Sequence, residues 1–142
     1  MALTRANCET VIVKRLKVLM EVAGLAVTYA GSNTDLGDPI SWALRRLGGA
    51  VADATTVTDA ELTAVATADW DDLFNLAEYR TLQTILGNLD LVDISAGPRS
   101  ERSSQLAQQV RGMIEAREAF VDAFVNPPTA GYITMDFACH GE

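Results

Sequence analysis

Apolar side chains recur every three or four residues over several stretches of the chain, which is the spacing of one face of a helix. The first stretch follows Thr4, which can cap a helix that runs to about Ala23, where Gly24 is suited to end it. The last stretch predicts a long helix from about Ser100 to Val125. Pro127-Pro128 cannot continue that helix, because proline lacks the backbone N–H donor.

Turn and capping residues divide the region that follows the first helix. Residues 27–37 are rich in Gly, Ser, Asn and Thr, which is typical of a loop. Asp38 followed by Pro39 predicts the start of a short helix, because a capping residue then precedes a proline at the first helical position. Gly48-Gly49 predicts the end of that helix.

Two further helix starts follow. Thr58 with Glu61 three residues later fits a capping box, which predicts a short helix to about residue 66. Asp69 then predicts the start of a longer helix that reaches about residue 86. Asp71 and Asp72 fall in its first turn, where carboxylates are favoured by the positive end of the helix dipole.

Gly87-Asn88 is expected to close this longer helix, and residues 90–98 are expected to form a connector to the last one. The elements together predict an all-α fold, a small bundle of about four to five helices with an extended C-terminal tail. We assign residues 1–128 to the helical bundle domain and residues 129–142 to the tail.

The tail differs in kind from the bundle. Tyr132, Ile133, Met135 and Phe137 place four apolar side chains within six residues. A segment this short cannot form a core of its own, so we expect a partner to cover it. An extended strand can add to the edge of a partner's sheet, which makes these four the predicted partner-binding residues.

Composition supports a helical domain. The chain has 142 residues, enough for one domain with its own core, and its 49% hydrophobic share contains few aromatic residues. Ala and Leu, which favour helix, are abundant. No stretch is long and apolar enough for a membrane span, and the N-terminus lacks the layout of a signal peptide, so we expect an intracellular protein with no membrane partner.

Charge is distributed unevenly along the chain. The net charge is −8, which disfavours sequence-independent binding to nucleic acid. Residues 1–34 carry a balance of +2, residues 35–93 of −8 and residues 94–142 of −2. Opposed charge on different faces suits head-to-tail contacts between identical subunits, which close into rings.

The residues that carry chemistry are few. The only histidine is His140, and the only cysteines are Cys8 and Cys139, which we interpret as idle thiols rather than a disulfide. Cys139 and His140 are neighbours at the chain end, which is poorly suited to hold a nucleophile and its base in register. Zinc needs about four nitrogen or sulfur ligands, and this chain offers only three candidates, the two cysteines and the histidine. We therefore predict no enzyme activity, no cofactor and no metal.

The pattern of helices and caps resembles the small helical head–tail adaptor (connector) proteins of tailed bacteriophages and related gene-transfer particles. The resemblance lies mainly in residues 38–125 and ends in the long last helix. The segments that carry it are DPI at 38–40, LRRLG at 44–48, VTDAEL at 57–62, LFNLAEYRTL at 73–82 and LGN at 86–88.

The resemblance implies a structural role. Such adaptors form a ring, usually of about twelve subunits, beneath the portal protein of the filled capsid. The ring extends the DNA channel, through which DNA passes without specific binding, and presents a surface to the next neck or tail protein. The C-terminal segment, here residues 131–137, is expected to reach the portal. The implied location is the virion neck, after synthesis in the host cytoplasm.

Other functions remain open at this point. The first alternative is a cytoplasmic helical dimerisation or regulatory module. A second is an enzyme that holds a metal with Asp69, Asp71, Asp72, Asp90 and Asp93. A third is a DNA-binding helix-turn-helix around residues 39–66, although this segment has only two basic residues, Arg45 and Arg46, and more acidic ones.

Overall fold

The computed structural model describes residues 2–95 and 100–125, with side chains for 2–89 and 105–124. All of its regular elements are helical, so the predicted all-α bundle is confirmed for this part of the chain. The predicted tail, residues 129–142, lies outside the described residues. The elements are α1 (Arg5–Val22), α2 (Thr34–Arg46), α3 (Asp59–Thr63), the short 3-10 turn η1 (Thr67–Asp69), α4 (Trp70–Ser95) and α5 (Ser100–Val125).

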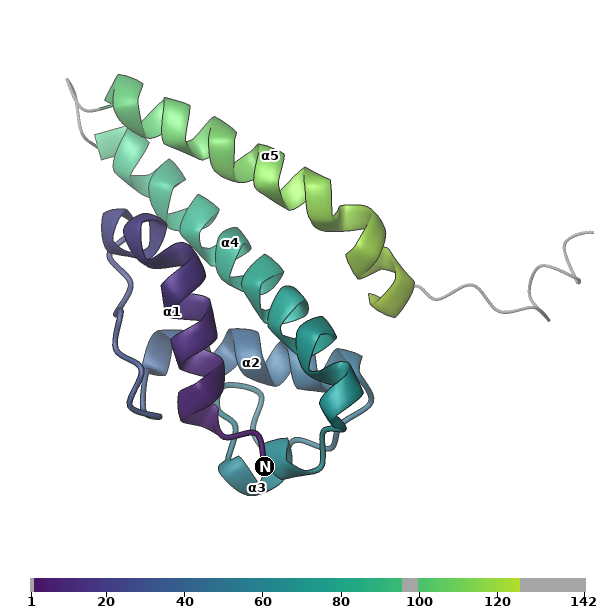
Figure 1. Cartoon of the computed structure of the whole chain (residues 1–142). Coiled ribbons are helices and arrows are strands. Elements are labelled where there is room, and N and C mark those ends of the chain that lie inside the picture. The colour runs from purple at the N-terminus through teal and green to yellow at the C-terminus, as the bar shows by residue number, and fades with distance from the viewer. Residues whose placement is uncertain (1, 96–99, 126–142) are drawn as a thin grey trace, which may run out of the picture.

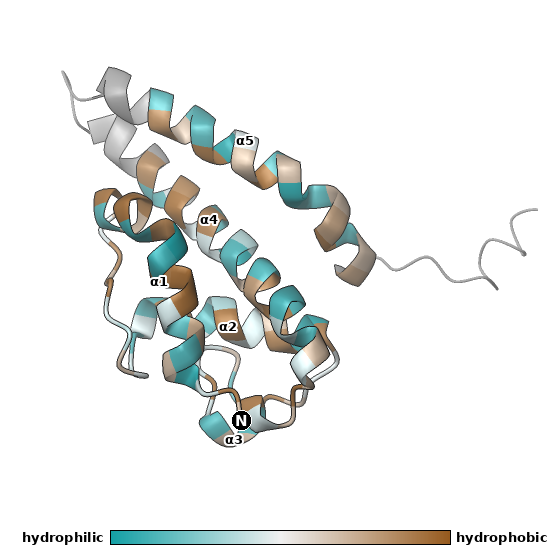
Figure 2. Cartoon of the chain, viewed as in Figure 1, coloured by the Kyte–Doolittle hydropathy of each residue, from teal (hydrophilic) through white to brown (hydrophobic). Residues whose placement is uncertain are grey.

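Helix α4 is the centre of the arrangement. It packs against α5 along its length, against α2 and against α1. In Figure 1, α5 runs beside α4 on one side, α1 lies on its other side, and α2 crosses behind α1. Apolar and polar positions interchange along each long helix, as expected where one face meets the core (Figure 2). The largest buried side chains come from every helix but α5; they include Ile12, Met20, Leu36, Ile40, Leu44, Leu62, Leu73, Leu76, Leu82 and Ile85.

The predicted first helix is confirmed at both ends. The hydroxyl of Thr4 accepts a hydrogen bond from the backbone N–H of Asn7 at 3.2 Å, which caps α1. After the C-cap residue Ala23 the chain turns through Gly24, whose φ of +80° lies in the left-handed region that glycine adopts most easily.

The predicted start of α2 at Asp38-Pro39 is wrong by about one helical turn, because the helix begins at Thr34. Asn33 is the cap, and its side-chain oxygen accepts from the backbone N–H of Asp35 at 2.9 Å. Pro39 consequently lies inside α2 and is buried. The loop expected at residues 27–37 is therefore shorter, whereas the predicted stop at Gly48 is confirmed by its φ of +88°.

The capping box of α3 is present as predicted. The Thr58 hydroxyl accepts from the backbone N–H of Glu61, and the Glu61 carboxylate accepts from the backbone N–H of Thr58 at 2.9 Å. The helix ends at Thr63 rather than near residue 66. Helix α4 begins at Trp70 after the 3-10 turn that contains Asp69, one residue from the predicted start.

The predicted end of α4 at Gly87-Asn88 is wrong, since the helix continues to Ser95. The side-chain amide of Asn88 donates to the carbonyl oxygen of Ala23 at 2.9 Å, a distant contact that caps the end of α1. Much of the connector expected at residues 90–98 is accordingly helical. The predicted bounds of α5 are confirmed.

Candidate interaction surface

A buried carboxylate joins the three long helices. Glu78 of α4 accepts from Arg15 of α1 at 3.0 Å and from Arg117 of α5 at 2.7 Å, with a different carboxylate oxygen for each. Arg117 also donates to the carbonyl oxygen of Met113 at 2.8 Å. Arg117 interrupts the apolar stripe of α5, and its guanidinium holds α5 on α4. This clamp fixes α1 and α5 on the two sides of α4 seen in Figure 1.

The exposed side of α1 combines cations with apolar side chains. Val18 is 72% exposed and Val22 is 45% exposed, and these are two of the three large exposed hydrophobic residues in the described part of the chain. Lys14 and Lys17 lie on the same exposed side, and neither has an ion-pair partner among the described side chains. We call Lys14, Lys17, Val18 and Val22 the α1 outer face.

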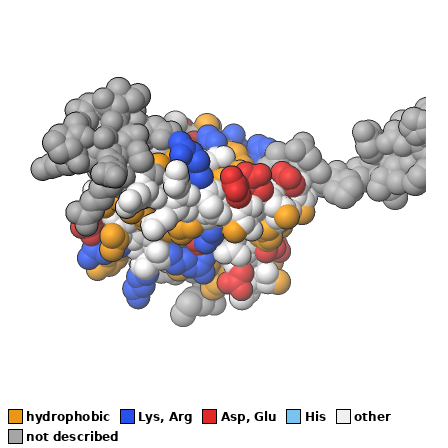
Figure 3. All heavy atoms as spheres, turned by 90° about the horizontal axis from the view of Figure 1, so that it is seen from above, with side chains coloured by type: hydrophobic (Ala, Val, Ile, Leu, Met, Phe, Trp, Pro, Cys, Tyr) orange, Lys and Arg blue, Asp and Glu red, His pale blue; other side chains and the backbone are white. Residues whose placement is uncertain are grey.

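A row of carboxylates follows α5. Glu115, Glu118 and Asp122 are exposed and recur at spacings of three and four, which places them along one side of the helix. Figure 3, seen from above, shows a group of acidic side chains on this upper face of the molecule. Burial, followed by the negative charges of Glu118 and Asp122, raises the pKa of Tyr79. We call these three residues the α5 acidic row.

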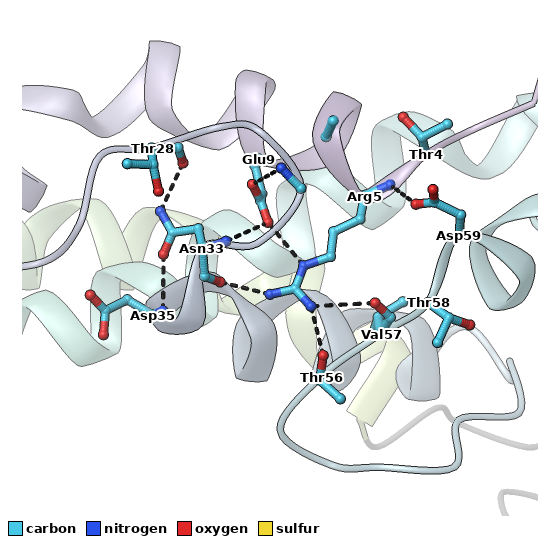
Figure 4. Close-up of polar contacts among 12 residues, drawn as sticks. Thr4, Arg5, Glu9, Thr28, Asn33, Asp35, Thr56, Val57, Thr58 and Asp59 are labelled. Carbon is cyan, nitrogen blue, oxygen red and sulfur yellow. Dashed lines mark hydrogen bonds and ion pairs between the residues drawn. The ribbon is translucent and has the colours of Figure 1, made fainter.

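A second buried ion pair is internal and structural. The Arg5 guanidinium contacts the Glu9 carboxylate at 2.9 Å and donates to Thr56 at 2.6 Å and to the carbonyl oxygen of Asn33 at 2.7 Å. Glu9, fully buried, also accepts from the backbone N–H groups of Gly31 and Asn33 at 2.8 and 3.1 Å. Figure 4 shows how these contacts tie α1 to the loops before α2 and α3. The contacts of Arg5 and Glu9 with these loops could not be predicted from local spacing along the chain.

Both tryptophans are partly buried at the edge of the core. Trp42 stacks on Tyr79 with ring centroids 6.1 Å apart. The guanidiniums of Arg46 and Arg80 lie 5.7 and 5.6 Å from the Trp42 ring, within cation–π distance. Trp70 is half-buried against the core.

A hollow of about 390 Å³ opens between the end of α2 and the α3–η1 segment. Glu61 and Asp69 are the acidic groups in its wall. Glu61 already accepts the backbone N–H groups of Thr58 and Ala52, and these hydrogen bonds lower its pKa. Among the described residues, no group of three or more His, Cys, Asp or Glu is placed to hold a metal ion. The side chains of Asp90 and Asp93 lie outside the described residues.

Cys8 gives a direct test of the core around α1. Its thiol is free and buried, and burial, aided by the charges of Glu9 and Asp59, raises its pKa to about 12. The thiol is thus neutral at pH 8 and out of reach. In a Cys139→Ala variant, we expect a thiol reagent to label Cys8 at under about one-hundredth of the rate in urea. Rapid labelling of the folded variant at pH 8 would contradict this packing.

Tyr132, Ile133, Met135 and Phe137, the predicted partner-binding residues, lie outside the described residues, as do Cys139 and His140. None of the helices in the described part of the chain is long and apolar enough to cross a membrane. In comparisons with known proteins, no family model, curated protein or solved structure matches this chain. What the α1 outer face and the α5 acidic row can bind is therefore inferred from the charge and exposure of their own side chains.

Proposed function

We propose that this protein is a structural adaptor that forms a ring in a virion neck, between the portal protein and the tail components. The observation that carries the proposal is the separation of charge on the surface of a helical bundle. Among the described side chains, the lysines of the α1 outer face and the carboxylates of the α5 acidic row have no ion-pair partner, and α4 lies between the two helices (Figure 1). Identical subunits with opposed faces can join head to tail and close into a ring.

The helix stop in LRRLG at 44–48 and the capping box in VTDAEL at 57–62 add support, because these segments resemble those of phage head–tail adaptors and the structure has both features. The acidic balance of residues 35–93 is also suited to a channel wall, since negative charge lets DNA slide rather than stick. In this proposal the protein has no catalytic role and needs no cofactor.

Electron microscopy of the concentrated protein, and of particles that contain it, tests the proposal. We expect a closed ring with a central hole, located at the particle neck. A cytoplasmic helical dimerisation or regulatory module, the alternative, would form only a small oligomer and would not copurify with particles. A dimer as the largest species at every concentration would remove the adaptor proposal.

The tail provides a prediction of its own. We expect truncation after Asn126 to leave a folded bundle that no longer attaches to its upstream partner, the portal in this proposal. Replacing Ile133, Met135 and Phe137 by serine in the full chain should have the same effect, because alternate residues of an extended strand share one face. Pull-down with the partner and thermal unfolding are the measurements.

The control removes only residues 138–142, which lie beyond the apolar group, and should keep partner binding. A large fall in melting temperature on truncation, with binding to the partner retained, would mean that the tail belongs to the bundle and is not an anchor.

A further inference from the structure

We propose that the α1 outer face of one copy docks on the α5 acidic row of a second copy of this chain, with Lys14 and Lys17 against Glu115, Glu118 and Asp122. The inference rests on the proposed function only in taking another copy as the occupant. It adds which surfaces meet and in what orientation.

The α1 outer face has the composition of a contact surface. Val18 and Val22 are one helical turn apart and form an exposed apolar pair, at 72% and 45% exposure. The other described helices carry no large hydrophobic residue that is comparably exposed, and the third such residue, Tyr29, lies in the loop after α1. Covering an exposed valine is favourable, because it removes apolar surface from water.

Charge selects the occupant. Lys14 and Lys17 precede the valines on the same side of α1, where Glu21 is also exposed, and neither lysine has an ion-pair partner within the described part of its own subunit. An acidic surface with apolar or small neighbours is the complement, and α5 provides one. Beside Glu115, Glu118 and Asp122, the exposed positions of α5 include Ala116 and Ala119, whose small side chains let another helix come close.

The orientation follows from the position of α4. Arg15 and Arg117 reach Glu78 from α1 and α5, so the two helices flank α4. The two faces are different surfaces of the subunit. A contact between the α1 outer face of one copy and the α5 acidic row of another is therefore heterologous, that is, head to tail. Each copy then offers one free face of each kind, and copies add in one direction until the assembly closes.

Charge reversal in the full chain tests the contact. Lys14→Glu with Lys17→Glu gives a chain with two acidic faces, and Glu115→Lys with Glu118→Lys gives one with two basic faces. Each variant alone should self-associate at least about tenfold more weakly than the wild type in low salt, because like charges then face each other. An equimolar mixture should regain the lost assembly, in alternating order. Sedimentation velocity measures both results, and circular dichroism checks that each variant is folded.

Asp69→Lys with Asp71→Lys is the matched control. Both aspartates are exposed, Asp69 in η1 and Asp71 in the first turn of α4, and neither belongs to the α1 outer face or to the α5 acidic row. The change in net charge equals that of the Glu115/Glu118 variant. This control should assemble like the wild type. Equal weakening by the control, or a mixture that stays as dissociated as its components, overturns the proposed contact.

The same experiment separates this inference from the proposed function. If the wild type forms rings that survive both reversals, the contact is wrong and the adaptor proposal stands. If the wild type forms only a small oligomer that the reversals break and mixing restores, the contact is right and the ring is wrong. A wild type that stays monomeric at every concentration overturns both.

Discussion

Replacing Glu9 by alanine should lower the free energy of unfolding by about 3–5 kcal/mol, the range measured when one partner of a buried ion pair is removed. Glu9 is fully buried and accepts from the Arg5 guanidinium and from the backbone N–H groups of Gly31 and Asn33. Without the carboxylate, two backbone donors lose their acceptor and the largely buried Arg5 guanidinium loses its counter-ion. Urea unfolding followed by circular dichroism gives the change directly.

Glu21→Ala is the matched control, since it is the same substitution in the same helix at an exposed position. It should change the free energy of unfolding by no more than about 0.5 kcal/mol. Replacing Arg5 and Glu9 together by Met and Leu should destabilise the protein less than the sum of the two single changes, because no unpaired charge is left behind. A Glu9→Ala variant as stable as the Glu21→Ala control would show that the network contributes nothing.

The sequence predicts best those features that depend on neighbouring residues. A cap acts within three residues, so Thr4 and the pair Thr58 and Glu61 could be identified from the sequence alone, and the structure places all three as expected. The amphipathic stripe of α5 is likewise local, and the bounds of that helix are confirmed.

The errors arise where a distant contact competes with a local signal. Asp38-Pro39 has the form of a helix start, yet Asn33 caps α2 earlier because its side-chain amide is also held by the carbonyl oxygens of Ala26 and Thr28. Asp38 instead pairs with Arg80 of α4 at 3.2 Å. Spacing within one element gives no information about such pairs.

The candidate surface could be predicted in outline only. Summing charge by segment identifies a basic first helix, where the α1 outer face lies, and an acidic middle over residues 35–93. The α5 acidic row lies instead in the last segment, whose balance is only −2, so the sum does not locate it. The pattern does not reveal that Arg5 and Arg15 pair inside the subunit, with Glu9 and Glu78, while Lys14 and Lys17 have no ion-pair partner among the side chains that the structure describes. That division needs the packing of α1 on α4.

Gly37→Ala should destabilise the protein by about 1–3 kcal/mol or more, although alanine is the better helix former. Gly37 lies inside α2, and a Cβ added there would fall far inside van der Waals contact of the Thr55 carbonyl oxygen. That atom belongs to the backbone of the loop before α3, so the helix or the loop must move. The measurement is again the free energy of unfolding in urea.

Gly87→Ala is the matched change, and the sign of its effect should be opposite. Gly87 lies inside α4, and a Cβ there would meet nothing within 4 Å, so the variant should gain about 0.5–1 kcal/mol from helix propensity alone. The pair also tests the course of α4, because a glycine that ended the helix with a positive φ would be destabilised by alanine. If both variants are more stable than the wild type, the loop before α3 does not lie against Gly37. If both are less stable, α4 ends near Gly87.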